Sequence, residues 1–500
     1  MTQPRTGREP LPTDVVERLR TALIAAGYEY DAVVTLLGPT AHAALMRNET
    51  TPGLRATSGG SALETLVRLW LLQAPVPVTA AEAALPDLVL PLCAAGILRR
   101  DADEVVAAVD LRPYATDEGG LWVASDLTPG LDGAPSRVRA DHVLGISSAS
   151  TSLAQLTVRG PVDRALDLGT GCGVQALHLA THARQVVATD VNSRAIRLAQ
   201  LNARLNQVDL DLREGSLFEP VAEERFDLVV TNPPFVISPA TGERLVYRDS
   251  GLPGDRVVER VVREAPEHLT DGGTCQVLAN WMILRDRPWD ERLSGWLGGV
   301  DAWVVQREVA DLPSYVELWL KDAGLHPATG GDPAEYRRRY DAWLAWFDEQ
   351  GADAVGFGWI NLRRGSSDPA AGGEVRFEQW PWEVAQPLGG EVAAHFERVG
   401  LLRRLDDRAL LAARPRVRPD VVQETHGPPG AEDPADIVLR QQTGLRRGRQ
   451  VDTATAALVG ACDGDLPLGR LLAAVEQLTG SPVPLATVRE LVTEGFLSLG

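Results

Sequence analysis

The chain has 500 residues, of which 44% are hydrophobic, and this is enough for about two to four domains with cores of their own. Its formal net charge of -19 disfavours a protein whose affinity depends on phosphate contacts, although an acidic protein can still carry a local basic groove. We expect a cytoplasmic protein without a metal, because the sequence shows no signal peptide, no membrane-spanning apolar run and no metal-ligand or disulfide spacing among its four cysteines.

Residues 1–125 predict an accessory domain that is rich in helices. Residues 62–73 have the spacing of an amphipathic helix. Further helices are expected at 78–85 and 88–95, followed by strands at 105–111 and 120–125. Helices followed by a short strand pair suggest a winged-helix-like module. Since the helix at 88–95 has no basic residue, we favour packing or protein contact over DNA binding.

A glycine-rich turn stands between an expected strand and an expected helix. An apolar run ends at residues 165–168, and residues 174–183 have helical apolar spacing, so the stretch from Asp167 to Gly173 is predicted to be a strand-to-helix turn. Such turns bind cofactors in doubly wound α/β sheets, because glycine permits close approach and the helix offers free N–H groups. Asp190 ends the next apolar run, where a carboxylate would bind ribose hydroxyls.

The charge of Asp167 indicates the kind of cofactor. Asp167 lies just ahead of the first glycine, where its carboxylate would repel the pyrophosphate of a dinucleotide. The carboxylate favours a cationic ligand with a ribose and no phosphate, and S-adenosylmethionine has these features. The alternative is a carboxylate that only caps the turn.

The tetrapeptide Asn232-Pro233-Pro234-Phe235 follows another expected strand, at residues 225–231. It therefore stands at the edge where open α/β sheets bind ligands, and its prolines favour extended backbone. The Asn232 side chain and the Pro233 carbonyl can accept both hydrogens of a planar NH2 group, on which Phe235 can stack. These four residues are the predicted catalytic group. The alternative is a strand-ending turn with a core phenylalanine.

Two segments after this tetrapeptide are candidates for substrate contact. A polar loop carries Tyr247 and Arg248 as expected substrate-binding residues, although Arg248 can equally pair with Asp249 on the surface. A helical insertion at residues 312–350 has aromatic side chains on one face. We favour a core role for this face, with a platform for a substrate peptide or base as the alternative.

Two segments are expected to join the domains. Residues 126–141 are rich in Gly, Pro and Asp, and residues 386–436 form an extension and a linker rich in Pro, Arg and acids. Residues 437–500 then predict a C-terminal helical, winged-helix-like module. Its helices are expected at 454–460, 468–478 and 485–493. The last of them has one basic residue, Arg489, so we again favour protein contact.

The turn with Asp167, the acid Asp190 and the Asn-Pro-Pro-Phe tetrapeptide together resemble class I S-adenosylmethionine-dependent methyltransferases. The similar subgroup has an Asn-Pro-Pro-aromatic motif and includes release-factor glutamine methyltransferases and RNA adenine or guanine N-methyltransferases. The resemblance implies that Gly169 and Gly171 border the methionine part and Val191 the adenine. Ser216 stands where many members carry an aspartate. The implied cofactor-binding residues are Asp167, Gly169, Thr170, Gly171, Asp190, Val191, Ser216, Leu217 and Asn232.

We therefore expect an α/β fold with a Rossmann-like seven-stranded methyltransferase sheet over residues 142–385 and accessory domains at both ends. By the resemblance, residues 355–363 form an antiparallel seventh strand beside a sixth at 300–305. The expected reaction transfers a methyl group to a planar amide or amino nitrogen, on a protein glutamine or an RNA base. The expected partners include no membrane. The alternative is a non-catalytic regulatory protein that binds S-adenosylmethionine.

Overall fold

The computed structural model describes residues 11–134, 138–239, 252–365, 373–429 and 435–499. The chain divides into two compact units: unit 1 comprises residues 1–154 and 161–371, and unit 2 comprises residues 155–160 and 372–500. Within the described residues, no single helix has the length and apolar character needed to cross a bilayer. One bent pair of short helices, Val78–Ala84 and Val89–Ala95, meets that test of length and composition only when its members are taken together.

The N-terminal part of unit 1 consists of helices followed by short strands, in the predicted order. The helical segments are α1 (Thr13–Ala25), α2 (Tyr30–Leu45), α3 (Thr51–Ala56), α4 (Ala62–Leu66) with its continuation η1 (Val67–Leu71), α5 (Val78–Ala84) and α6 (Val89–Ala95). The strands are β1 (Val76–Pro77), β2 (Leu98–Asp101), β3 (Glu104–Ala107), β4 (Asp110–Thr116) and β5 (Gly119–Ser125). The single strand expected at 105–111 is two strands, because the chain leaves the β1-β3-β2 sheet after Ala107 and forms a separate β4–β5 hairpin.

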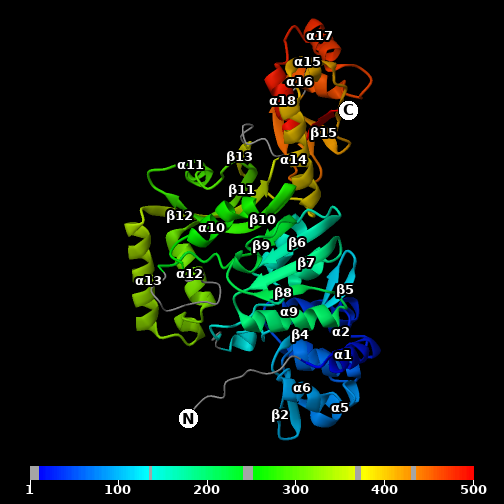
Figure 1. Cartoon of the computed structure of the whole chain (residues 1–500), viewed down its shortest axis with the longest axis vertical. Coiled ribbons are helices and arrows are strands. Elements are labelled where there is room, and N and C mark those ends of the chain that lie inside the picture. Colours follow the sequence, from blue (N-terminus) through cyan, green and yellow to red (C-terminus); the bar gives the residue numbers. More distant parts are fainter. Residues whose placement is uncertain (1–10, 135–137, 240–251, 366–372, 430–434, 500) are drawn as a thin grey trace. The chain divides into compact units, whose positions relative to one another are not determined.

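This N-terminal part shares a hydrophobic core with two later helices, α8 (Val174–Leu179) and α9 (Ser193–Leu205). Leu198 and Leu205 of α9 are buried in the same cluster as Leu19 of α1. The Asn202 side chain of α9 also accepts a hydrogen bond from the Ala124 backbone in β5, at 2.7 Å. Figure 1 shows α1 beside α9. The residues expected as an accessory domain are therefore fastened to the central sheet through α9.

Unit 1 contributes seven strands to the central sheet, the number predicted. They are β6 (Val162–Leu168), β7 (Ala183–Asp190), β8 (Asp211–Glu214), β9 (Phe226–Thr231), β10 (Leu269–Leu284), β11 (Asp301–Asp311) and β12 (Ala352–Arg363). Their order is β11-β12-β10-β9-β6-β7-β8. Strands β6 to β10 pair in parallel, and β12 runs antiparallel between β10 and β11. The expected α/β fold with an antiparallel seventh strand is confirmed.

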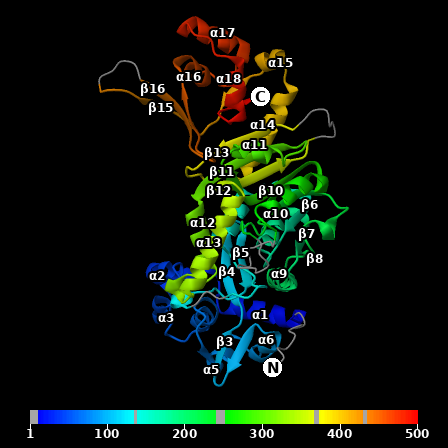
Figure 2. The same ribbon diagram turned by 90° about the vertical axis from the view of Figure 1, so that its left-hand side faces the viewer.

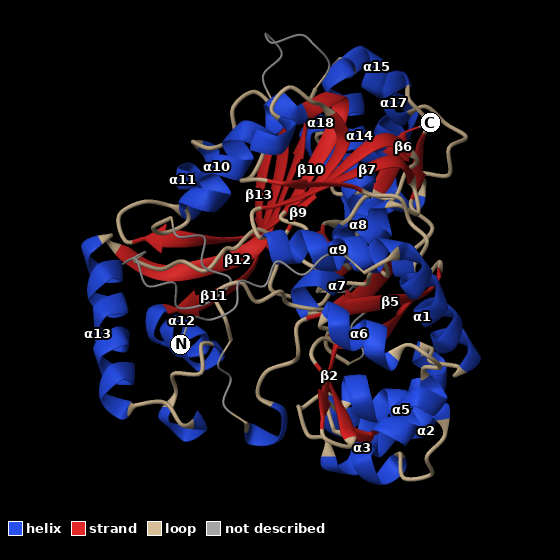
Figure 3. Ribbon diagram, turned by 60° about the horizontal axis from the view of Figure 1, so that its bottom comes forward, coloured by secondary structure: helices blue, strands red, loops and turns tan. Residues whose placement is uncertain are grey.

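Helices cover both faces of this sheet (Figure 3). Helices α8 and α9 pack on β6, β7 and β8, whereas α10 (Arg256–Glu264) and α11 (Trp289–Ser294) pack on β10. The expected insertion consists of α12 (Leu312–Asp322) and α13 (Pro333–Glu349), which lie side by side against the β11–β12 pair (Figure 2). Both helices begin with an aspartate cap followed by a proline within the first turn, which explains their sharp starts.

Unit 2 has its own hydrophobic core, formed mainly by three helices at the predicted positions: α16 (Thr453–Gly460), α17 (Leu468–Thr479) and α18 (Leu485–Thr493). The segment expected as an extension and linker, residues 386–436, instead contains regular elements. They are α14 (Gly389–Arg404), α15 (Asp407–Ala412), β14 (Pro415–Val417) and β15 (Val421–His426). β14 pairs with β18 (Leu497–Leu499), and β15 pairs with β16 (Asp436–Gln441), which pairs with β17 (Gly448–Val451). The high Pro and Arg content of residues 386–436 predicted a linker. In the structure, the Arg418 side chain forms ion pairs with Glu391 and Asp420, so this arginine is part of the folded unit.

Candidate active site

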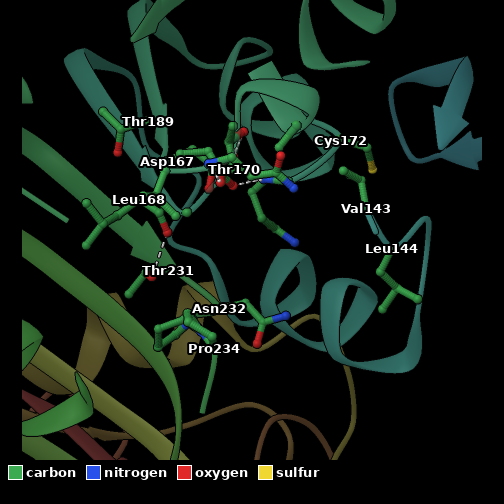
Figure 4. Close-up of a pocket in the computed structure, with 18 of the residues that line it drawn as sticks. Val143, Leu144, Asp167, Leu168, Thr170, Cys172, Thr189, Thr231, Asn232 and Pro234 are labelled. Atoms are coloured by element: carbon green, nitrogen blue, oxygen red, sulfur yellow. Dashed lines mark hydrogen bonds between the residues drawn. The ribbon is translucent and has the colours of Figure 1, made fainter. Parts of the chain in front are cut away.

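A cavity of about 710 Å³ opens at the carboxyl ends of β6, β7 and β9 (Figure 4). Parallel neighbours end at the same edge of a sheet, and the register places Thr231, Leu168 and Thr189 side by side at this edge. The cavity is lined by every predicted site residue that the structure describes: Asp167, Gly169, Thr170, Gly171, Asp190, Val191, Ser216, Leu217, Asn232, Pro233, Pro234 and Phe235. The predicted substrate residues Tyr247 and Arg248 lie outside the described residues.

The glycine turn has the conformation that its sequence requires. Gly169 and Gly171 have φ values of 76° and 57°, in the left-handed region that favours glycine. A Cβ added at either position would meet no atom within 4 Å, so the turn leaves open space on its cavity side. The backbone N–H groups of Gly169 and Thr170 both donate to the Thr189 carbonyl at 2.9 Å. The turn is therefore fixed to β7 while one side stays free for a ligand.

Asp167 is buried in the cavity wall, with 1% of its surface exposed. Its Oδ2 accepts hydrogen bonds from Thr170 Oγ1 at 2.6 Å and from the Ala176 backbone at 3.0 Å. The carboxylate therefore caps the turn, as the alternative interpretation of Asp167 in the sequence analysis stated. Burial raises the pKa of Asp167 to about 7, and the neighbouring charge of Asp190 adds to this rise. A cation placed in the cavity would favour the ionised form.

Asp190 closes β7 opposite the glycine turn. Its carboxylate accepts hydrogen bonds from the backbone of Gly171 at 2.9 Å and of Asn192 at 2.8 Å, while burial raises its pKa. The next residue, Val191, is 67% exposed although it is apolar, and it lines the cavity. Leu217 on the facing loop has a left-handed φ of 47°. An acid beside an exposed apolar surface suits a ligand with a ribose and a flat base.

One wall of the cavity comes from the end of the predicted linker, residues 126–141, and from the residues directly after it. Asp141, His142 and Val143 line the cavity, and the Asp126 carboxylate accepts a hydrogen bond from the Val143 backbone at 2.8 Å. Asp126 also pairs with Arg194 near the start of α9. Although burial opposes ionisation, the hydrogen bonds from Arg194 and Val143 hold the pKa of Asp126 below its usual value. No local pattern in the sequence indicates this pair, because its members are 68 positions apart.

Asp126→Asn is expected to weaken the binding of S-adenosylmethionine about fivefold, because losing a charge-assisted contact of about 1 kcal/mol loosens the wall at Val143. Titration calorimetry with S-adenosylmethionine measures the effect. Asp163→Asn is the matched control, since Asp163 pairs with Arg184 while both side chains are more than 70% exposed. Equal affinities of the two variants would contradict the assigned role of Asp126.

Asn232 leaves β9 at the floor of the cavity, with Thr231 fixed by its hydroxyl group to the Leu168 carbonyl at 2.7 Å (Figure 4). The Asn232 Oδ1 atom is buried and has no hydrogen-bond partner within the described part of the chain. A buried polar atom without a partner costs about 1–3 kcal/mol, so native structures rarely keep one without a reason. An acceptor is therefore available at the place predicted for a substrate NH2 group.

Phe235 lies between the cavity and an aromatic cluster. It lines the cavity, and its ring meets Trp319 of α12 edge-on with 6.2 Å between the centroids. Trp343 and Phe347 of α13 are 2% and 0% exposed within the same cluster. The interpretation of the aromatic face as core is confirmed for these side chains. No group of three or more potential metal ligands occurs among the described residues.

The region around the cavity matches a known family. Residues 145–294 match the family model described as the methyltransferase small domain. This region is a class I methyltransferase domain. Two other models, each described as a domain of unknown function, match residues 25–108 and 393–498. The methyltransferase domain therefore stands between two regions whose families give no indication of a role.

Curated relatives match the methyltransferase domain. A ribosomal protein uL3 glutamine methyltransferase of Bradyrhizobium diazoefficiens is 35% identical over 154 residues, which are 28% of this chain and 48% of the relative. A release factor glutamine methyltransferase of Geobacter sulfurreducens is 40% identical over 22% of this chain and 43% of the relative. A ribosomal RNA small subunit methyltransferase C of Alcanivorax borkumensis is 31% identical over 24% and 33%. The chain thus spans about half or less of the length of these relatives.

Proposed function

We propose that this protein is an S-adenosylmethionine-dependent N-methyltransferase that acts on a planar amide or amino nitrogen. The observation that carries the proposal is the buried, unpartnered Oδ1 of Asn232 in the floor of the cavity. An acceptor at this place suits the planar NH2 group of a methyl acceptor. The regulatory alternative supplies no such group.

The residues of the cavity fit the cofactor. A volume of about 710 Å³ lies within the range of about 300–1,000 Å³ that is typical of small-molecule sites. We assign Asp190 to the ribose hydroxyls, Val191 and Ser216 to the adenine side, and Gly169 and Gly171 to the methionine side. Asp167 supplies negative charge beside a ligand that carries a sulfonium and an ammonium group. When bound, S-adenosylmethionine supplies an electrophilic methyl group.

The protein's own part in the reaction is to hold the acceptor nitrogen. Asn232 Oδ1 and the Pro233 carbonyl accept its two hydrogens, which leaves the lone pair free to point toward the methyl group. Phe235 packs on the planar group and limits its rotation. Because the nitrogen loses a proton after it has gained the methyl group and a positive charge, no strong general base is required.

The acceptor belongs to a protein glutamine or to an exocyclic amine of an RNA base. Relatives named for a ribosomal protein, a release factor and ribosomal RNA support a component of translation, and hence action in the cytoplasm. We also propose that residues 1–125 and 142–385 are distinct domains, and separate family models over 25–108 and 145–294 support this division. The third predicted domain, residues 437–500, is extended toward its N-terminus, because its family model matches residues 393–498.

Transfer of labelled methyl from S-adenosylmethionine into a lysate of the source cells tests the function, with parallel treatment by ribonuclease or protease. Label lost with ribonuclease would identify an RNA base as the acceptor, and label lost only with protease would identify a protein. Cofactor binding without any transfer would favour the regulatory alternative.

A further inference from the structure

The segment that follows β9 has few backbone N–H groups that could hold it in place. Pro233 and Pro234 have no backbone N–H group, so the segment cannot continue the hydrogen bonding of the sheet there. The backbone N–H of Ile237 does find a partner: it donates to the hydroxyl oxygen of Tyr315 at 2.8 Å in a buried contact. Tyr315 belongs to α12, so this bond ties the acceptor segment to the helical insertion, 78 positions further along the chain.

The Tyr315 ring is itself held firmly. Tyr315 is 0% exposed, and its ring centroid lies 6.0 Å from that of Trp319, 6.0 Å from that of Phe347 and 5.8 Å from that of Phe357. These neighbours come from α12, α13 and β12. A phenol packed on several sides has a fixed position, so its hydroxyl group is a fixed point for the Ile237 backbone.

A second contact joins the same helix to the tetrapeptide. Trp319 meets Phe235 edge-on, and Val236 and Ile237 are both buried in the cluster that contains Tyr315 and Trp319. The segment from Phe235 to Ile237 is thus held by α12 through one hydrogen bond and through apolar packing. Only Pro234 separates this segment from Asn232 and Pro233.

We propose that Tyr315 is a positioning residue for methyl transfer, and that the insertion formed by α12 and α13 is a structural part of the acceptor site. This inference rests on the proposed function. Tyr315 does not line the cavity. It fixes the distance between the sheet and the segment that carries the Asn232 and Pro233 acceptors. A misplacement of about 1 Å at a reacting pair can lower a rate by about 100-fold, so removal of the hydroxyl group is expected to act on the rate rather than on cofactor binding.

Tyr315→Phe tests the inference because it removes the hydroxyl group and keeps the ring. Tyr340→Phe is the matched control: the Tyr340 hydroxyl group donates to Glu317 Oε1 at 2.9 Å within the same insertion. Each protein is assayed for label transfer into the source lysate while the concentration of S-adenosylmethionine is varied, which separates the maximal rate from the KM for the cofactor. Calorimetry gives the Kd for S-adenosylmethionine without any acceptor.

We expect Tyr315→Phe to lower the maximal rate about tenfold or more, with the KM and Kd for S-adenosylmethionine unchanged, and Tyr340→Phe to match the unaltered protein. An unchanged rate in Tyr315→Phe would overturn the inference. So would a weaker Kd in that variant, or an equal loss in both variants, because each would indicate a general structural role. Should Tyr315→Phe not fold, Trp319→Phe is measured in its place under the same criteria. Absence of label with the unaltered protein would instead overturn the proposed function, and this inference with it.

Discussion

Asn232→Ala is expected to lower the rate of methyl transfer by about 10²–10³-fold, the loss typical of removing one preorganised polar group from a transition state. The side-chain oxygen is one of two acceptors available to the substrate NH2 group, and it is already buried without a partner. Alanine removes this acceptor and leaves the two prolines that shape the segment. Because Asp190, Val191 and the glycine turn remain in place, most of the affinity for S-adenosylmethionine should remain.

The measurement is the initial rate of label transfer at saturating cofactor, together with the Kd for S-adenosylmethionine. Asn206→Ala is a suitable control, because the Asn206 amide bonds to the Trp122 backbone at 2.9 and 2.7 Å and does not line the cavity. It should lower the melting temperature and leave the rate unchanged. An unaltered rate in Asn232→Ala would contradict the catalytic assignment. Equal losses in both variants would point to destabilisation instead.

The parts of the site that the sequence revealed carry local signals. Gly169 and Gly171 stand at a strand-to-helix turn, and Asn232 precedes two prolines after an apolar run. In both places the residue type alone indicates the backbone conformation, because glycine permits a left-handed turn and a proline favours extended backbone in the residue before it. Once these residues are assigned to the ends of neighbouring parallel strands, their meeting in one cavity follows from the topology of the sheet.

The parts that the sequence did not reveal depend on pairs that are far apart in the chain. Asp126 lies in a segment whose Gly, Pro and Asp content is typical of a linker, yet it pairs with Arg194 and holds the backbone of Val143, which lines the cavity. Tyr315 lies in the helical insertion expected at residues 312–350, and nothing in its spacing indicates a hydrogen bond to Ile237. Periodicity shows which face is buried, but it does not show which buried hydroxyl group meets which backbone atom.

The affinity for S-adenosylmethionine is expected to rise about fivefold between pH 6 and pH 7.5, and Asp167→Asn should abolish this rise. Burial raises the pKa of Asp167 to about 7, so the ionised fraction increases steeply across this range. The ionised carboxylate attracts the cationic ligand, whereas the neutral acid does not. The cofactor's own ammonium group stays largely protonated up to about pH 7.5, so the rise belongs to the protein. At pH 7.5 the variant should bind about tenfold more weakly than the unaltered protein.

The raised pKa of Asp167 also predicts how the stability of the ligand-free protein depends on pH, and the direction is opposite to that of the affinity. Because the folded pKa lies above the unfolded value of about 3.9, the contribution of Asp167 to stability is complete below about pH 4 and is lost as the pH rises to about 7. Ligand-free stability and ligand affinity should therefore change in opposite directions with pH, and both changes should disappear in Asp167→Asn. Asp163→Asn alters an exposed carboxylate in the same strand and should keep both slopes. A pH-independent affinity in the unaltered protein, or an undiminished slope in Asp167→Asn, would show that Asp167 only caps the turn.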